Sequence, residues 1–302
     1  MKLSIGVPFA AAFAMALVLW PAGASGVVLQ DSNQPAIHPS DNIVGRYGTN
    51  ASLVVISPDY AITTRHQGDS STVVINGTTY YDTAVATGGP SGNSDIRIIR
   101  LWKDSAHTVD ANLSNFSGLY NGTNEIGAQI TIGGHGRTAG TALKANGDAN
   151  ITYAFMWGGN NNNTNPVTWG TNKIEETDIG GGTYTSDVIV GYFDRLDTAA
   201  STPYEAIPAA YDSGGGYFIS VNGQWYVAGL TRGVQRANVS VFRDPNSPYE
   251  DMPDGFDGVR VSSYASWITS NVPESVSVIP EPVSLSLMLA GTAAVLARRR
   301  RA

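Results

Sequence analysis

The chain of 302 residues contains no cysteine. Disulfide bonds, thiol catalysis and cysteine-ligated zinc are therefore excluded, and an exported form of the chain must rely on packing alone. Charged residues are scarce, at 14%, and the formal net charge is −7. Low charge disfavours a helical bundle, and an acidic surface repels phosphate backbones, so no nucleic-acid partner is expected.

Histidine is also rare, with four copies, and none of them stands at metal-ligand spacing from another histidine or a carboxylate pair. We therefore expect no metal and no cofactor, because structural and catalytic metals need three or four convergent ligands. Any chemistry that this chain performs would then have to use side chains and backbone groups alone.

Glycine is abundant, with 34 copies, and 42% of the residues are hydrophobic. Short runs rich in β-branched and aromatic residues recur between glycine, asparagine, aspartate or proline, which is typical of an antiparallel barrel or sandwich. The predicted strands are 52–56, 60–64, 71–75, 96–101, 128–132, 187–193, 217–221 and 224–230. Asn222-Gly223 predicts a tight hairpin, 261–268 a helix, and the polar run 158–165 a surface loop.

The first 24 residues have the layout of a secretory signal. Lys2 precedes an apolar run from Leu3 to Leu19, and Ala22-Gly23-Ala24 offers a small-residue cleavage site. Cleavage is expected after Ala24, because the apolar run is short for a permanent membrane anchor. The mature domain is then predicted to span 25–270, with a linker at 271–279.

The last 23 residues, 280–302, are organised differently. Pro280-Glu281-Pro282 precedes an apolar stretch from Val283 to Ala297, and Arg298 to Arg301 close the chain. This order resembles the PEP-CTERM sorting signal of Gram-negative bacteria. The resemblance implies transient membrane association, recognition by an exosortase-type enzyme, and release to the cell envelope or extracellular matrix; a permanent tail anchor is the alternative.

Three residues stand where hydrolytic chemistry could be built. His66 follows a buried strand, Asp95 precedes one, and Ser213 lies in the glycine-rich bend Asp212 to Gly216. A serine hydroxyl needs an imidazole to take its proton, and the imidazole needs a carboxylate to fix its tautomer. Rigid strand ends and glycines would hold the three groups and leave room for a substrate.

In chain order these segments resemble the trypsin-like serine proteases. The resemblance extends over Gly48 to Ser270 and rests on six segments: 52–66 with the histidine, 95–101 with the aspartate, 132–138, 212–215 with the serine, 225–230, and the closing helix 259–268. It implies an all-β fold of two packed six-stranded antiparallel barrels with a C-terminal helix. The triad would lie across the interface between the barrels.

By this resemblance His66 is the general base, Asp95 its orienting partner and Ser213 the nucleophile, with backbone N–H groups of Tyr211 and Ser213 as the oxyanion hole. His135 stands where the family often has an aromatic residue and is read as structural; His38 and His107 lie in no motif.

Three positions depart from the family. Tyr211 replaces a glycine whose N–H is an oxyanion donor, and losing one such donor can cost about a hundredfold to a thousandfold in rate. Asp212 in the family often pairs with a new N-terminal amine; Ile43-Val44-Gly45 resembles that start but is read here as a core strand. Ile207 falls near the base of the specificity pocket, where trypsins have aspartate, so an apolar or small substrate side chain is expected.

Two functions follow from this pattern. The first is an exported serine endopeptidase acting on protein or peptide through an acyl-enzyme. The second is a catalytically impaired protease-fold module that binds partners in the extracellular matrix. An α/β-hydrolase is disfavoured, because Tyr211 fills the first glycine of the nucleophile elbow and helices do not alternate with strands.

Overall fold

The computed structural model describes residues 26–145, 148–243 and 255–279. The predicted export signal at 1–24 and the predicted sorting segment at 280–302 lie outside the described residues. Within the described part of the chain, no helix has the length and apolar character needed to cross a membrane. Within the predicted linker 271–279, the Ser277 carbonyl accepts from Leu119 N–H at 2.8 Å.

Six strands form a closed barrel in the first half of the chain. They are β2 (Val44–Tyr47), β3 (Ala51–Ser57), β4 (Tyr60–Thr63), β5 (Thr72–Ile75), β6 (Thr78–Thr87) and β7 (Arg97–Trp102), in the order β2-β3-β4-β7-β6-β5. Alternate residues such as Leu53, Val55, Val73 and Ile99 fill its interior, as the period of two in a strand requires. The barrel confirms the first half of the predicted fold.

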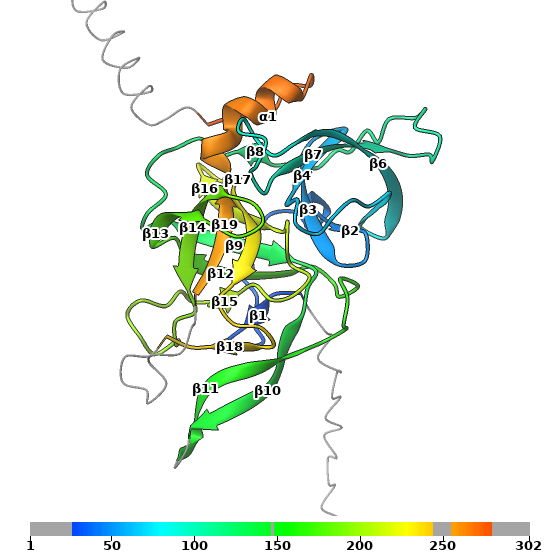
Figure 1. The fold of residues 1–302 in the computed structure, drawn as a ribbon. Helices are drawn as coiled ribbons and strands as arrows, with labels where there is room; N and C mark the ends of the chain where they lie inside the picture. The colour runs from blue at the N-terminus through cyan, green and yellow to red at the C-terminus, as the bar shows by residue number, and fades with distance from the viewer. Residues whose placement is uncertain (1–25, 146–147, 244–254, 280–302) are drawn as a thin grey trace, which may run out of the picture.

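The second half forms a sheet of eight strands. They are β8 (Gly118–Leu119), β9 (Gln129–Gly134), β12 (Thr168–Lys173), β13 (Glu176–Gly180), β14 (Ser186–Tyr192), β16 (Gly216–Val221), β17 (Gln224–Val234) and β19 (Gly255–Arg260). Its order is β12-β9-β16-β17-β19-β14-β13, with β8 pairing β17. The prediction of a second closed six-stranded barrel is therefore corrected to an unclosed sheet. Figure 1 shows this sheet, green to orange, beside the blue and cyan barrel.

The chain changes partners between the two outermost strands of this sheet, β12 and β13. Ile174 N–H donates to the Ala128 carbonyl beside β9, whereas Glu175 N–H donates to the Val190 carbonyl of β14. Just before this switch, the Asn172 amide of β12 donates to the Tyr192 carbonyl of β14 at 2.7 Å. A side chain thus links the two ends of the sheet.

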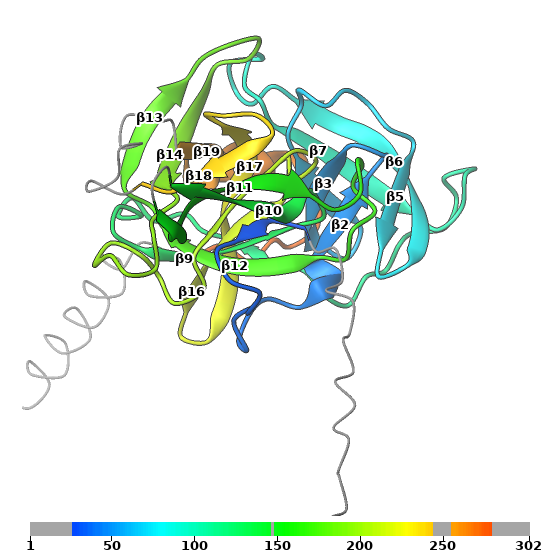
Figure 2. The same cartoon turned by 90° about the horizontal axis from the view of Figure 1, so that it is seen from below.

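Two small sheets complete the fold. Strand β1 (Val28–Leu29) pairs with β15 (Ala206–Ile207), and β10 (Thr138–Ala145), β11 (Asp148–Gly158) and β18 (Val239–Val241) form a three-stranded sheet. Figure 1 places the long β10–β11 hairpin at the opposite end of the molecule from the C-terminal helix, and Figure 2 shows the molecule from the hairpin end.

A shared apolar core joins the barrel to the second sheet. Ile62 and Ile98 of the barrel pack in one cluster with Phe218 and Val259 of the sheet. The same cluster contains Ile268 of α1 (Ala265–Asn271), which continues the 3-10 turn η2 (Val261–Tyr264). The predicted helix is therefore confirmed, and it seals the interface at which the site is built.

The polar run 158–165, predicted as a surface loop, is partly buried instead. Asn163 is 1% exposed, and its amide donates to carbonyls of Tyr47 and Ala51 in the first barrel. Asn165 is equally buried and donates to the Gly136 carbonyl. Because an amide carries two donors, each of these side chains satisfies backbone carbonyls that water cannot reach.

Candidate active site

His66 and Asp95 are held together by the turn that follows β4. The backbone N–H groups of Arg65 and His66 both donate to Asp95 Oδ1, each at 2.8 Å. The His66 ring contacts the other oxygen, with Nδ1 2.7 Å from Oδ2. Asp95 is itself anchored through its N–H, which donates to Ser186 Oγ in the second sheet at 2.7 Å. Both halves of the molecule therefore fix this carboxylate.

Ser213 completes a continuous chain of polar contacts. Its Oγ lies 2.9 Å from His66 Nε2. An ionised Asp95 can only accept, so Nδ1 must carry the proton that points at it. In the neutral ring Nε2 is then unprotonated and accepts from the Ser213 hydroxyl. This is the tautomer in which an imidazole can take a proton from a nucleophile.

The environment keeps Asp95 ionised. Burial by itself raises its pKa, but the hydrogen bond from His66 and the N–H groups of Arg65 and His66 outweigh burial, so the pKa lies below its ordinary value. The carboxylate is 3% exposed, whereas the His66 ring is 33% exposed. The base therefore faces solvent, and its partner does not.

The serine bend is clamped between the two halves. Ser52 N–H of β3 donates to the Ser213 carbonyl at 2.7 Å, and Gly214 N–H donates to the Thr231 carbonyl of β17 at 2.8 Å. Gly214 has a φ of +81°, and a Cβ there would collide with Thr63 Oγ1. Only glycine fits, because both the torsion and the space exclude a side chain.

Tyr211 adopts a φ of +75°, the left-handed region that glycine favours. The carbonyl of Ala210 accepts from Arg137 N–H at 2.9 Å. Because the peptide is trans and planar, the N–H of Tyr211 points to the side opposite that carbonyl. In the described part of the chain neither this N–H nor that of Ser213 has an acceptor. Two donors are thus available beside the serine.

We expect Tyr211→Gly to stabilise the fold by no more than about 1 kcal/mol and to change activity by less than about tenfold. Glycine relieves the positive φ but makes the unfolded chain more flexible, and Arg137 already sets the peptide direction. Thermal denaturation measures the first effect, and the rate at which a fluorophosphonate probe labels Ser213 measures the second. A labelling rate that rises well beyond tenfold would show that tyrosine displaces the loop in solution.

Asp212 is completely buried and is held by backbone donors alone. Gly136 N–H donates to Oδ1 at 2.7 Å, while Ala209 N–H at 2.9 Å and Val27 N–H at 3.3 Å donate to Oδ2. Burial raises the pKa of Asp212 to about 7, against the opposing effect of the Ala209 and Gly136 N–H groups. Among the described residues, the N-terminal segment that donates to Asp212 is therefore the one at Val27 and not the one at Ile43.

The remaining candidates lie away from this chain of contacts. Val44 and Gly45 lie buried in β2, which confirms a core strand there, whereas Ile43 is buried at the end of the turn η1 (Asp41–Ile43). Ile207 is 3% exposed and pairs with Val28. His135 Nδ1 lies 2.8 Å from the Asn165 carbonyl. His38 stacks on Trp169, and His107 lies against Trp102.

Two contacts at the site are predicted by no pattern in the sequence. Val27 reaches Asp212 across 185 positions of sequence, and Arg232 lies beside Asp95, with Nε 3.8 Å from Oδ2. Neither residue belongs to a motif, and only the packing of the two sheets places them. Among the described residues no group of three or more histidines and carboxylates is arranged to hold a metal ion.

No protein-family model matches the chain, and no curated protein matches it. Solved structures show a partial likeness. The crystal structure of Rv3671c protease in an inactive form has 17% identity and a TM-score of 0.45, covering 76% of this chain and 89% of that one. An inactive serine-to-alanine mutant of Rv3671c from M. tuberculosis H37Rv has 15% identity and a TM-score of 0.47, covering 80% of this chain and 100% of that one. Both scores lie below 0.5, so neither decides what this chain is.

Proposed function

We propose that the protein is a trypsin-like serine endopeptidase in which Ser213 is the nucleophile, His66 the general base and Asp95 its orienting partner. One observation carries the proposal: a single line of hydrogen bonds runs from Ser213 Oγ through the His66 ring to a buried, ionised Asp95. These residues come from three separate segments of the chain. A histidine with only a structural role would not require a serine hydroxyl at the ring nitrogen that faces solvent.

The chemistry follows from the protonation states. His66 Nε2 takes the Ser213 proton as Oγ attacks a substrate carbonyl, and Asp95 stabilises the imidazolium. The free N–H groups of Tyr211 and Ser213 are the donors that could receive the negative charge on the substrate oxygen. The imidazolium then protonates the leaving amine. Water, activated by the same ring, hydrolyses the acyl-enzyme.

An extended peptide fits the edge of β17 near the serine. The pairing of β16 with β17 stops at Gly216 and Leu230, and the backbone of Thr231 bonds to the serine bend. Strand β17 then continues from Arg232 to Val234 with only β19 beside it among the described strands. An added strand can hydrogen-bond such an edge. Next to it, a cavity of about 300 Å³ is lined by Val190, Phe256 and Gln235 among others. This edge favours a polypeptide over a small ester as substrate.

A fluorophosphonate probe tests the proposal directly, because it reacts only with an activated serine. Labelling of the wild type, mapped to Ser213 by mass spectrometry and unchanged by EDTA, is the expected result. Cleavage of a peptide library should accompany it. If the folded wild type is neither labelled nor active on peptides, the proposal is wrong and a binding role for the fold takes its place.

A further inference from the structure

Arg232 lies against the carboxylate proposed to orient the catalytic base. Its Nε is 3.8 Å from Asp95 Oδ2, the same oxygen that bonds the His66 ring. This separation exceeds a hydrogen bond, so the guanidinium acts on Asp95 through its charge. The Arg232 side chain is 17% exposed and that of Asp95 is 3% exposed, and screening by solvent is correspondingly weak.

A β-bulge directs Arg232 to this place. Along the β17–β19 pair, Thr231 faces Gly258 and Gly233 faces Asp257, so Arg232 is the extra residue between two matched positions. Bulges redirect a side chain relative to the regular alternation of a strand. Arg232 is thereby turned toward the barrel interface instead of following the pattern of its neighbours.

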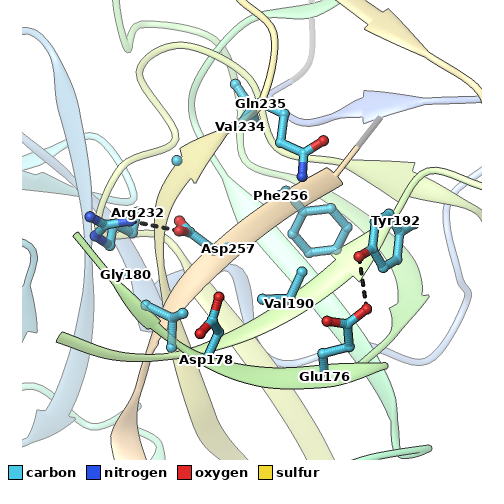
Figure 3. Close-up of a pocket in the computed structure, with 12 residues that line it drawn as sticks. Glu176, Asp178, Gly180, Val190, Tyr192, Arg232, Val234, Gln235, Phe256 and Asp257 are labelled. Carbon is cyan, nitrogen blue, oxygen red and sulfur yellow. Dashed lines mark hydrogen bonds and ion pairs between the residues drawn. The ribbon is translucent and has the colours of Figure 1, made fainter. Parts of the chain in front are cut away.

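Asp257 and the carbonyl of Gly181 hold the guanidinium still. Nη1 donates to Asp257 Oδ2 at 2.6 Å, and Nη2 donates to the Gly181 carbonyl. Figure 3 shows Arg232 and Asp257 joined in this way at one side of the cavity, with Phe256 and Val190 beyond them. The arginine therefore stands between two carboxylates, Asp95 on the catalytic side and Asp257 on the cavity side.

The other charged and titratable neighbours are accounted for. Arg65, next to His66, is directed away, since its guanidinium lies over the Tyr184 ring and donates to the Gly92 carbonyl. The pKa of Asp257 lies above its ordinary value, chiefly because of burial, and Arg232 opposes this rise. The charges of Asp95 and His66 also act on Asp257, the first raising its pKa and the second lowering it. Among the described contacts, the charged side chains placed beside the His66–Asp95 pair are thus Arg232 and, behind it, Asp257.

We infer that Arg232 is a positioning residue for the triad: with Asp257 as its counter-ion, it fixes Asp95 and sets how much of the Asp95 charge is available to His66. The inference rests on the proposed function, because it assigns a role at the same site. It differs from a structural role in one consequence. Arg232 and Asp257 have opposite charges, so removing one or the other must shift the basicity of His66 in opposite directions.

Arg232→Gln removes a cation near the imidazolium and is expected to raise the kinetic pKa on the acid limb of kcat/KM by about one unit. Asp257→Asn leaves the cation uncompensated and is expected to lower that pKa by about half a unit. The double variant should return close to the wild type. Arg232→Lys keeps the positive charge but lacks the planar guanidinium group. The kinetic pKa of this variant should therefore lie nearer to that of the wild type than the kinetic pKa of Arg232→Gln does.

Arg100→Gln is the matched control, because Arg100 is also paired with an aspartate, Asp110 at 2.7 Å, but lies on β7 about 16 Å along the chain from Asp95. It should leave the profile unchanged. If Arg232→Gln and Asp257→Asn both fold, both label Ser213 and shift the kinetic pKa in the same direction or not at all, the inference is overturned.

An NMR titration of the His66 ring in each folded variant separates this failure from failure of the proposed function. The titration needs no turnover. Opposite shifts of the ring pKa support the electrostatic role of Arg232 even if the wild type proves inactive, and absent shifts contradict it even if the protease is active.

Discussion

Ser213→Ala is expected to lower kcat by about a millionfold and to abolish fluorophosphonate labelling, because no other hydroxyl stands at 2.9 Å from His66 Nε2 among the described contacts. His66→Ala should cost nearly as much. The double variant should be no worse than either single one, since a base without its nucleophile has nothing to activate. The kcat values of the wild type, the two single variants and the double variant in peptide cleavage form the double-mutant cycle that tests this.

Asp95→Asn should be severe but milder, at about ten-thousandfold. The contacts of Asp95 explain why. Oδ1 accepts two backbone N–H groups, so the asparagine oxygen must remain there. Its NH₂ then faces His66 Nδ1, which can no longer carry a proton. The ring is forced into the other tautomer, with Nε2–H directed at Ser213, and cannot act as a base.

Asp82→Asn provides the control for Asp95→Asn. Asp82 is also a buried carboxylate, but it lies on β6 of the first barrel and contacts no triad residue. Its replacement should leave kcat unchanged. Equal losses in the two variants, or additive losses for Ser213→Ala and His66→Ala, would contradict the triad.

Asp212→Ala is the second change with a large expected effect. It removes the acceptor of three buried N–H groups, those of Val27, Gly136 and Ala209. Each buried donor left unpaired costs about 1–3 kcal/mol, so the total is comparable with the whole stability of an ordinary domain. We expect a large fall in the unfolding temperature and loss of labelling at Ser213, because the loop through Tyr211 loses its anchor.

The pH dependence of stability reports on the same carboxylate. Burial raises the pKa of Asp212 from 3.8 to about 7 in the folded chain. A raised pKa favours folding while the unfolded group is still protonated, below about pH 4, and this advantage is lost as pH rises to about 7. The loss amounts to roughly 4 kcal/mol. Chemical denaturation between pH 4 and 8 should show the decline.

A free amine at Val27 should reverse this decline. A chain shortened to begin at Val27 carries an ammonium at the atom that lies 3.3 Å from Asp212 Oδ2. The opposite charge lowers the pKa of the carboxyl, so stability near pH 7 should exceed that of a chain beginning two residues earlier, at Ser25. The gain should fade at alkaline pH as the amine loses its proton. Equal stability of the two chains at pH 7 would contradict this pairing.

This comparison also bears on the predicted export signal at 1–24. If the signal is removed after Ala24, as predicted, the chain begins at Ser25 and carries no ammonium at Val27. Mass spectrometry of the N-terminal residue of the processed chain tests this.

Local chemistry made many elements predictable from the sequence. Runs of β-branched and aromatic residues between turn residues predicted strands such as Ala51–Ser57 and Gly216–Val221, because such side chains pack well on a buried, pleated surface. The hairpin at Asn222-Gly223 was equally determined, and both residues have positive φ there. The residues proposed for the triad could be named because six segments in chain order resemble the trypsin-like family; a histidine, an aspartate or a serine near a strand end is by itself a weak signal.

Long-range packing decided what the sequence could not. The partner switch at Ile174 and Glu175 depends on which strands the two N–H groups meet, and no local pattern records that choice. Asn163 looks like loop material because asparagine favours turns, yet here its amide satisfies buried carbonyls of the barrel. A polar side chain is buried wherever the fold leaves acceptors without water.

The electrostatics of the site belong wholly to the tertiary structure. The contact of Arg232 with Asp95 needs a bulge in β17 and the docking of two sheets. The contact of Val27 with Asp212 needs the N-terminal segment to pair with β15. Sequence specifies which groups can ionise, but their pKa values and partners depend on burial and distance, and these exist only once segments far apart in the chain have packed together.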